Sequence, residues 1–177
     1  SLADIVARHG PISVLVNAAG ITRDTSLRRM SEQQWSDVIT VNLDGVFNTC
    51  RALIDGMTER GFGRIVNISS VNGQTGQFGQ TNYSAAKAGM HGFTMALARE
   101  VAKKGVTVNS VSPGYCETAL VMAVAEPVRE QIIANIPVGR LGKPCEIARV
   151  VDFLCAEDSA FITGANIPVN GGYFMDF

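Results

Sequence analysis

The sequence lacks three features that would point to common classes of protein. It has no run of about 20 apolar residues, which a membrane-spanning helix would need, so we expect no membrane partner. It has no excess charge of either sign, because 15 basic and 16 acidic residues give a net charge of -1. This balance does not favour binding to nucleic acid or to an anionic membrane. It also has no Cys-x-x-Cys pair and no histidine at zinc-ligand spacing, so we expect no metal site.

The cysteines are few and widely separated. They are Cys50, Cys116, Cys145 and Cys155. We expect all four to be buried or half-buried free thiols, which is typical of a reducing compartment and predicts a cytoplasmic protein. The first ten residues have neither the basic start nor the apolar segment of a signal peptide. They resemble the end of an amphipathic helix with Leu2, Ile5 and Val6 on one face.

Apolar strand-like runs alternate with helical patterns along the 177 residues. Strands are expected at 12–16, 64–68, 106–111 and 165–169. Helices are expected at 31–60, after the capping box Ser31 to Gln34, and at 82–104, 118–135 and 145–155. Gly61 and Gly63 should end the first of these helices. The pattern predicts an α/β fold with a parallel sheet, in one domain that spans residues 1–177.

Small or polar residues follow three consecutive strands. These segments are Asn17-Ala18-Ala19-Gly20, Ser69-Ser70 and Pro113-Gly114. The carboxyl ends of parallel strands meet at one edge of the sheet, where open α/β folds bind their ligands. A serine hydroxyl there could hydrogen-bond a substrate oxygen, although a turn or helix-cap role is an equal alternative for Ser70 alone.

Tyr83 and Lys87 lie four residues apart in a helical pattern, so they share one face. A nearby ammonium stabilises a phenolate and should lower the pKa of Tyr83, which would then serve as an acid towards a carbonyl oxygen. By itself this spacing is common, and two helix-surface residues are the simpler interpretation. The polar strand ends around it favour the catalytic one.

Taken together, these motifs resemble the short-chain dehydrogenase/reductase family over essentially the whole chain. The resemblance implies the C-terminal part of a Rossmann-like, doubly wound parallel sheet with about four strands and flanking helices. It implies Ser70, Tyr83, Lys87 and Asn42 as catalytic residues, with Asn42 holding a water beside Lys87. A structural role for Asn42 is compatible with the same position. The residues implied to contact the cofactor are Asn17, Ala18, Ala19, Gly20, Tyr83, Lys87, Pro113, Gly114, Cys116 and Thr118.

Several longer segments are similar to the acetoacetyl-CoA reductases of polyhydroxybutyrate synthesis. They include Gly20 to Asp24, Gly76 to Tyr83, His91 to Ala98 and Ser112 to Tyr115. The resemblance implies reduction of an acyl-CoA thioester with NADPH, or alternatively NADH, and formation of (R)-3-hydroxybutyryl-CoA. It implies that the substrate contacts are Asp24, Gln77, Phe78, Gln80 and Tyr115.

Two departures from the family pattern stand out. Ala18 replaces the second asparagine of the family's Asn-Asn-Ala-Gly signature, and Cys116 stands where the family usually has Ile or Val. Because cysteine is also small and apolar, we expect Cys116 to pack rather than to carry redox chemistry.

No Gly-rich phosphate-binding turn lies near the N-terminus. By comparison with a complete mononucleotide-binding half, roughly 70 residues and three strands are expected to be missing. Strand 12–16 would then be an open apolar edge, which promotes pairing with another chain. The helices at 31–60 and 82–104 are the family's usual dimer faces, so a homo-oligomer is expected. A 3-oxoacyl-carrier-protein reductase and an inactive fragment or assembly partner are the alternative functions.

Overall fold

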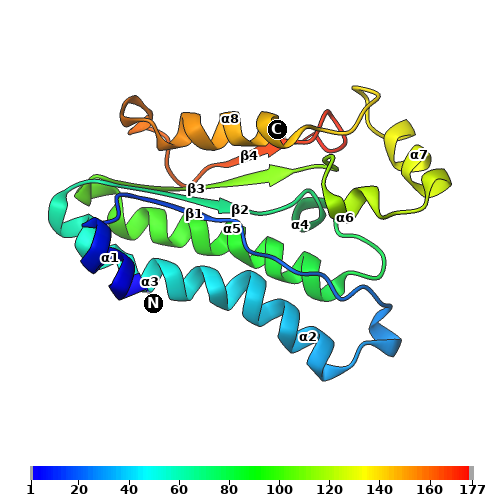
Figure 1. The fold of residues 1–177 in the computed structure, drawn as a ribbon, viewed down its shortest axis with the longest axis horizontal. Coiled ribbons are helices and arrows are strands. Elements are labelled where there is room, and N and C mark those ends of the chain that lie inside the picture. The colour runs from blue at the N-terminus through cyan, green and yellow to red at the C-terminus, as the bar shows by residue number, and fades with distance from the viewer. Residues whose placement is uncertain (1, 176–177) are drawn as a thin grey trace.

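The computed structural model describes residues 2–175. Four parallel strands form one sheet in the order β1-β2-β3-β4. The strands are β1 (Val14–Asn17), β2 (Gly63–Ile68), β3 (Val106–Pro113) and β4 (Asn166–Val169). Figure 1 shows helices on both faces of this sheet. The predicted α/β fold with a parallel sheet of four strands is therefore confirmed.

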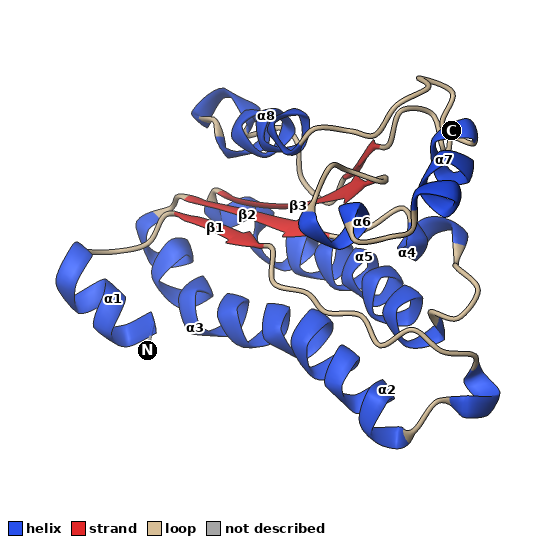
Figure 2. Cartoon of the chain, turned by 45° about the vertical axis from the view of Figure 1, so that its right-hand side comes forward, coloured by secondary structure: helices blue, strands red, loops and turns tan. Residues whose placement is uncertain are grey.

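Two long helices cover one face of the sheet and one helix covers part of the other (Figure 2). The first face carries α3 (Gly45–Arg60) and α5 (Thr81–Val101), and the second carries α8 (Pro144–Cys155). The larger apolar core lies on the α3/α5 side and includes Met57, Ile65 and Met90. A smaller core lies under α8 around Val66, Val111 and Leu154. Alternate residues of the buried strands therefore point into different cores.

The expected helix at 31–60 is interrupted by a π-helical turn. It consists of α2 (Glu32–Ile39), the turn Thr40–Asp44 and α3. The capping box at its start is confirmed, because Ser31 Oγ accepts from the Gln34 amide at 3.1 Å and Gln34 Oε1 accepts from the Ser31 amide at 2.9 Å. At its end, Gly61 adopts a left-handed conformation with φ 69°. Gly63 belongs to β2, which corrects the prediction that it helps to end the helix.

Several shorter elements differ from the expected pattern. The predicted loop 71–80 contains the single-turn helix α4 (Asn72–Thr75). The predicted helical segment 118–135 is two helices, α6 (Ala119–Met122) and α7 (Glu126–Ala134). Pro127 lies in the first turn of α7, where its fixed φ favours a new helix start. Helix α5 ends in a 3-10 turn, Ala102–Lys104, and further 3-10 turns lie at Leu27–Arg29 and Glu157–Ser159. The N-terminal helix is α1 (Leu2–His9).

β1 is an edge strand of the sheet in the described part of the chain, as the sequence predicted. Its side chains Val14 and Val16 are 43% and 41% exposed. They point to the α8 side, because Leu15 packs into the opposite core. Helix α8 packs mainly on β2 and β3, and these two valines remain in contact with solvent.

Within residues 2–175 no helix is long and apolar enough to cross a membrane, and no group of three potential metal ligands gathers. The four cysteines are free thiols. Cys50 and Cys116 are buried and Cys155 is half-buried. Cys145 is exposed in the first turn of α8, which corrects the expectation that all four are at least half-buried.

Candidate active site

The carboxyl ends of the first three strands lie side by side. Asn17 is the register partner of Asn67, and Ile68 is the partner of Val111. The segments that follow these strands therefore meet at one edge of the sheet, as predicted. The Val71 amide donates to the Pro113 carbonyl at 2.8 Å, which joins the segment after β2 to the end of β3.

Helix α5 places Tyr83 and Lys87 at this edge. The Nζ of Lys87 lies 5.6 Å from the centroid of the Tyr83 ring and donates a 2.7 Å hydrogen bond to the carbonyl oxygen of Ile68. Ser69 Oγ donates to the carbonyl oxygen of Lys87 at 3.0 Å. The predicted pairing of the two side chains on one helix face is confirmed, and the lysine is held directly over the end of β2.

Burial dominates the ionisation of this pair. Lys87 is 3% exposed, and loss of hydration lowers its pKa to about 8. Burial raises the pKa of Tyr83, and the charge of Asp24 raises it further, while a hydrogen bond with Ser70 lowers it. The prediction that the ammonium would bring the pKa of Tyr83 down is therefore wrong, because desolvation of the phenolate is the largest cause of the shift and Lys87 is not among its causes. Tyr83 is a protonated phenol at neutral pH.

Ser70 lies beside the phenol of Tyr83. Its hydroxyl lies close enough to Tyr83 to lower the pKa of that phenol, and its Oγ accepts from the Asn72 amide at 3.2 Å. The segment after β2 thus places a hydroxyl next to the acidic hydrogen of Tyr83. Ser70 and Lys87 therefore both lie beside Tyr83.

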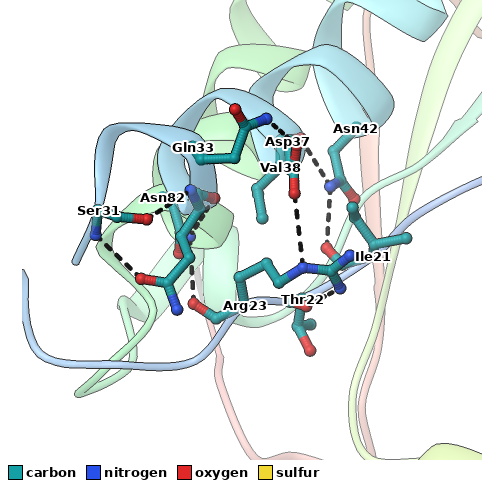
Figure 3. Close-up of polar contacts among 10 residues, drawn as sticks. Ile21, Thr22, Arg23, Ser31, Gln33, Asp37, Val38, Asn42 and Asn82 are labelled. Carbon is teal, nitrogen blue, oxygen red and sulfur yellow. Dashed lines mark hydrogen bonds and ion pairs between the residues drawn. The ribbon is translucent and has the colours of Figure 1, made fainter.

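Asn42 lies in the π-helical turn and is fully buried. Its Nδ2 donates to the carbonyl oxygens of Ile21 and Val38 at 2.9 and 2.8 Å, bonds that Figure 3 shows. Its Oδ1 is buried and has no partner among the described residues. A Cβ added to Gly20 would lie 2.7 Å from this oxygen and 3.6 Å from Nζ of Lys87. Asn42 therefore combines its structural tie with an unused acceptor that lies near Lys87.

Asn82 supports the site, and sequence reasoning missed it. It is fully buried, and its Oδ1 accepts from the Tyr83 amide at 2.8 Å. Its Nδ2 donates to the carbonyl oxygens of Arg23 and Gln34 at 3.3 and 3.1 Å (Figure 3). One amide thus joins the start of α5 to the 20–24 segment and to α2. The only sequence signal was an uncharged polar residue directly before Tyr83.

Three of the predicted substrate residues, Asp24, Gln80 and Tyr115, are linked through Asp24, whose charge also reaches Tyr83. Gln80 Nε2 donates to Asp24 Oδ2 at 2.8 Å, and Gln80 Oε1 accepts from Asn72 Nδ2 at 2.9 Å. The charge of Asp24 raises the pKa of Tyr83 and also that of Tyr115. Burial is the larger cause for Tyr115, whose pKa rises to about 12.

The other two predicted substrate residues lie on the exposed loop before α5. Phe78 is 91% exposed and Gln77 is also exposed. The described chain does not bring these two side chains against Tyr83. On the opposite side of the site, the Tyr115 ring packs edge-on against Tyr173, with centroids 5.4 Å apart.

The residues predicted to contact a cofactor follow β1 and β3. Ala18, Ala19 and Gly20 are exposed after β1. The Asn17 amide is buried and is used within the protein, because it donates to Asn67 Oδ1 at 2.8 Å and its Oδ1 accepts from Thr49 at 2.7 Å. Its side chain therefore stabilises the sheet.

The segment after β3 continues from Pro113 and Gly114 towards α6. The Gly114 amide donates to the Val169 carbonyl at 3.0 Å, which fixes the segment to β4. Cys116 is buried against Gly142, and burial raises the pKa of its thiol, in agreement with the expected packing role. Thr118 is exposed and caps α6, with Oγ1 accepting from the Val121 amide at 3.5 Å.

Comparison with known proteins agrees with this arrangement. A family model described as enoyl-(acyl carrier protein) reductase matches residues 1–174. The chain is 61% identical to the acetoacetyl-CoA reductase of Allochromatium vinosum over 172 residues, which are 97% of this chain and 70% of that protein. The Cupriavidus necator acetoacetyl-CoA reductase is 60% identical over 94% of this chain and 68% of its own length. The 3-oxoacyl-[acyl-carrier-protein] reductase FabG of Pseudomonas aeruginosa is 48% identical over 99% of this chain and 71% of its own length.

Proposed function

Because this chain belongs to the short-chain dehydrogenase/reductase family of oxidoreductases, we propose that it reduces the 3-ketone of acetoacetyl-CoA to (R)-3-hydroxybutyryl-CoA. The observation that carries the proposal is the Ser70, Tyr83 and Lys87 cluster at the carboxyl edge of the sheet. The acetoacetyl-CoA reductases at about 60% identity support the substrate.

The site fits a nicotinamide dinucleotide, which would supply the hydride. Three features support the fit: the exposed backbone of Ala18, Ala19 and Gly20, the buried lysine next to it, and the unused Oδ1 of Asn42. Lys87 donates to the Ile68 carbonyl, and an ammonium carries three donors, so it has hydrogens left for a ribose hydroxyl. Pro113, Gly114, Cys116 and Thr118 would border the same group. NADPH is the expected form, and NADH is the alternative that a cofactor assay distinguishes.

Tyr83 would give the hydroxyl proton to the ketone oxygen as the carbonyl carbon accepts hydride, so that the ketone becomes an alcohol and Tyr83 becomes a phenolate. Ser70 would hold the ketone oxygen by a hydrogen bond beside Tyr83. Lys87, which is mostly protonated at pH 7 with a pKa of about 8, would stabilise the phenolate formed in this step. Asn42, whose Oδ1 lies near Lys87, would hold a water through which Tyr83 recovers its proton.

The thioester would lie between the 24–25 segment and the loop before α5. The Thr25 amide donates to the Gly79 carbonyl at 2.8 Å, so a hydrogen bond joins these two segments. Asp24 and Gln80 would form the floor of this site, and Tyr115 would form one side. Gln77 and the exposed ring of Phe78 would be the outer contact for a pantetheine arm.

A 3-oxoacyl-carrier-protein reductase is the alternative, and the Pseudomonas aeruginosa FabG match favours it as a second candidate. A carrier protein is acidic, and its reductases tend to have a basic loop where this chain has Gly61-Phe62. The uncharged loop favours CoA. The ratio of kcat/KM for acetoacetyl-CoA to that for acetoacetyl-carrier protein distinguishes the two substrates.

NADPH oxidation with acetoacetyl-CoA tests the proposal, with wild type and Tyr83→Phe measured side by side. Loss of the phenol proton should lower kcat by about 10²- to 10⁴-fold, the usual contribution of a positioned general acid. Tyr173→Phe removes a phenol that contacts Tyr115 and not Tyr83, and it serves as the matched control, which should retain most of the wild-type kcat. A folded wild-type chain without turnover would favour the inactive assembly partner. Equal turnover in wild type and Tyr83→Phe would contradict the mechanism.

We also propose a homo-oligomer in the cytoplasm. Trp35, Phe47 and Met95 on α2, α3 and α5 are each about half exposed. The free thiols support a reducing compartment. Sedimentation velocity at micromolar concentration tests the assembly, and a single monomeric species would contradict it.

A further inference from the structure

A row of polar side chains crosses the sheet at one level. Asn17 is the register partner of Asn67, Asn67 of Ser110, and Ser110 of Asn166. Register partners point to the same face, so all four side chains face the α3/α5 layer. Asn17 Nδ2 donates to Asn67 Oδ1 at 2.8 Å, and Ser110 Oγ donates to Asn166 Oδ1 at 3.0 Å. We call these four residues the polar row.

Helix α5 is hydrogen-bonded to the polar row at two points, directly through Thr94 and by way of Ser112 through His91. Asn67 Nδ2 donates to Thr94 Oγ1 at 2.9 Å, and the two residues are 0% and 1% exposed. His91 Nε2 lies 3.2 Å from Ser112 Oγ, which in turn donates to Asn166 Oδ1 at 2.7 Å. Because the Ser112 proton is used in that second bond, the His91 nitrogen is the donor, so the neutral ring carries its proton on Nε2.

The spacing connects these anchors to the reaction centre. Lys87, His91 and Thr94 are separated by four and three residues, so they lie on one stripe of α5, and Tyr83 continues this stripe one turn earlier. The neighbours Ala86, Met90 and Ala98 are apolar and buried. Apolar contacts alone are not directional and would tolerate a small rotation or slide of the helix. The two hydrogen-bonded anchors add directional contacts in the middle of α5 to those that Asn82 and Lys87 make nearer its start.

We propose that Thr94 and His91 are positioning residues, which hold the rotation and axial position of α5 through the polar row so that Tyr83 and Lys87 meet Ser70. The inference rests on the proposed reductase function for its kinetic consequence. Thr94 acts through Asn67 and is the stronger anchor because both groups are fully buried. His91 is half-buried and acts through Ser112.

The test compares two threonine-to-valine changes that are chemically identical. Thr94→Val removes the anchoring hydroxyl and keeps the side-chain volume. Thr107→Val removes a buried hydroxyl that has no partner among the described residues and lies in β3 outside the site. Thr94→Ser and His91→Gln are the conservative variants that retain a hydroxyl and a donor respectively. His91→Leu removes the donor.

We expect Thr94→Val to lower kcat by about tenfold to a hundredfold with KM within about twofold, because a misplaced acid affects the chemical step most. Thr94→Ser should recover most of this loss, and Thr107→Val should retain wild-type kcat. His91→Leu should lose less than Thr94→Val, and His91→Gln should recover that loss. Equal kcat for Thr94→Val and Thr107→Val would overturn the proposal.

A second readout does not depend on turnover. Titration of ¹³C-labelled tyrosine by NMR reports the pKa of Tyr83, assigned by the signal missing in Tyr83→Phe. If α5 moves, Tyr83 becomes less buried, so Thr94→Val should bring this raised pKa back towards 10.0, the value of an unperturbed tyrosine, and Thr107→Val should not. If wild type reduces no acetoacetyl-CoA, the proposed function fails, and the titration still decides the positioning role. An unchanged Tyr83 titration in Thr94→Val would reject it.

Discussion

A Cβ atom at Gly20 would lie only 2.7 Å from Oδ1 of Asn42, an oxygen that is itself held by the two hydrogen bonds of the same amide. The segment after β1 can therefore approach the π-helical turn only because residue 20 has no side chain. Residue 20 therefore lies close to both Asn42 and Lys87.

Gly20→Ala should destabilise the fold by about 1 to 3 kcal/mol, because the methyl group must displace Asn42 or the backbone. It should also lower kcat, since Asn42 lies close to Lys87 in the site. Gly45→Ala is the matched control, because its Cβ would meet the nearest atom at 3.7 Å and alanine favours a helix. Urea unfolding of both variants measures the difference. Equal stabilities would show that the segment moves freely.

Lys87→Met should remove a pH dependence of stability. The pKa of Lys87 is about 8 in the folded chain, against 10.5 for an unperturbed lysine. The unfolded chain therefore binds more protons between these pH values, and stability rises with pH there. Relative to Lys87→Met, wild type should gain about 3 kcal/mol from pH 8 to pH 10.5.

Urea unfolding of both proteins at pH 7, 8, 9, 10 and 10.5 measures this gain, and taking the difference cancels the titration of the other buried groups. A constant difference would mean that Lys87 is solvated in solution.

Asp24→Asn should move the alkaline limb of the pH profile of kcat/KM to lower pH. The charge of Asp24 raises the pKa of Tyr83, so its removal favours the phenolate and lowers that pKa. Asparagine keeps an oxygen that can accept from Gln80. Asp37→Asn provides the comparison, because Asp37 pairs with Arg23 at 3.7 Å and does not contribute to the shift at Tyr83. If the alkaline limb of the pH profile of kcat/KM lay at the same pH in both variants, the prediction would be contradicted.

Asn82→Asp should destabilise the chain more than Asn82→Ala at neutral pH. A carboxylate at this position would face the carbonyl oxygens of Arg23 and Gln34, to which Asn82 now donates. Alanine leaves these oxygens unpaired, at a cost of about 1 to 3 kcal/mol each where water cannot replace the donor. Thermal unfolding at pH 7 ranks the two variants. The reverse order would show that the carboxyl group is protonated or turned to solvent.

The fold was largely predictable because its strands are short apolar runs with clear stops. Residues 64–68 and 106–111 contain β-branched residues bounded by glycine or proline, and the structure places both in the centre of the sheet. The shared helix face of Tyr83 and Lys87 and the place of Ser70 after a strand were predictable from local pattern, while their grouping as one site came from the family resemblance. The break between the two helices inside 118–135 was not predicted because this segment has little apolar periodicity.

The remaining features of the site depend mainly on tertiary contacts, which a local sequence pattern does not show. The π-helical turn leaves a weak trace, because the buried positions Val38, Asn42, Val46 and Cys50 follow one another at intervals of four, longer than the 3.6 of an α-helix. Asn82 and Thr94 resemble ordinary helix residues until their partners on distant segments are known. The pKa of Tyr83 could not be predicted from the charge of Lys87 alone, since it depends on how much water the fold removes.

The π-helical turn at Thr40–Asp44 also makes the packing of the long helix sensitive to the number of residues in it. Each residue of an α-helix advances the chain by about 100° around its axis, so the wider turn sets the angular phase between α2 and α3. Gln34, before the turn, accepts a hydrogen bond from Asn82 of α5 through its carbonyl oxygen, while Thr49, after the turn, donates to Asn17. Both halves can face their partners only with the present residue count. Point substitutions leave this phase intact, whereas a single-residue insertion or deletion between Ser31 and Arg60 would rotate one half away from the molecule.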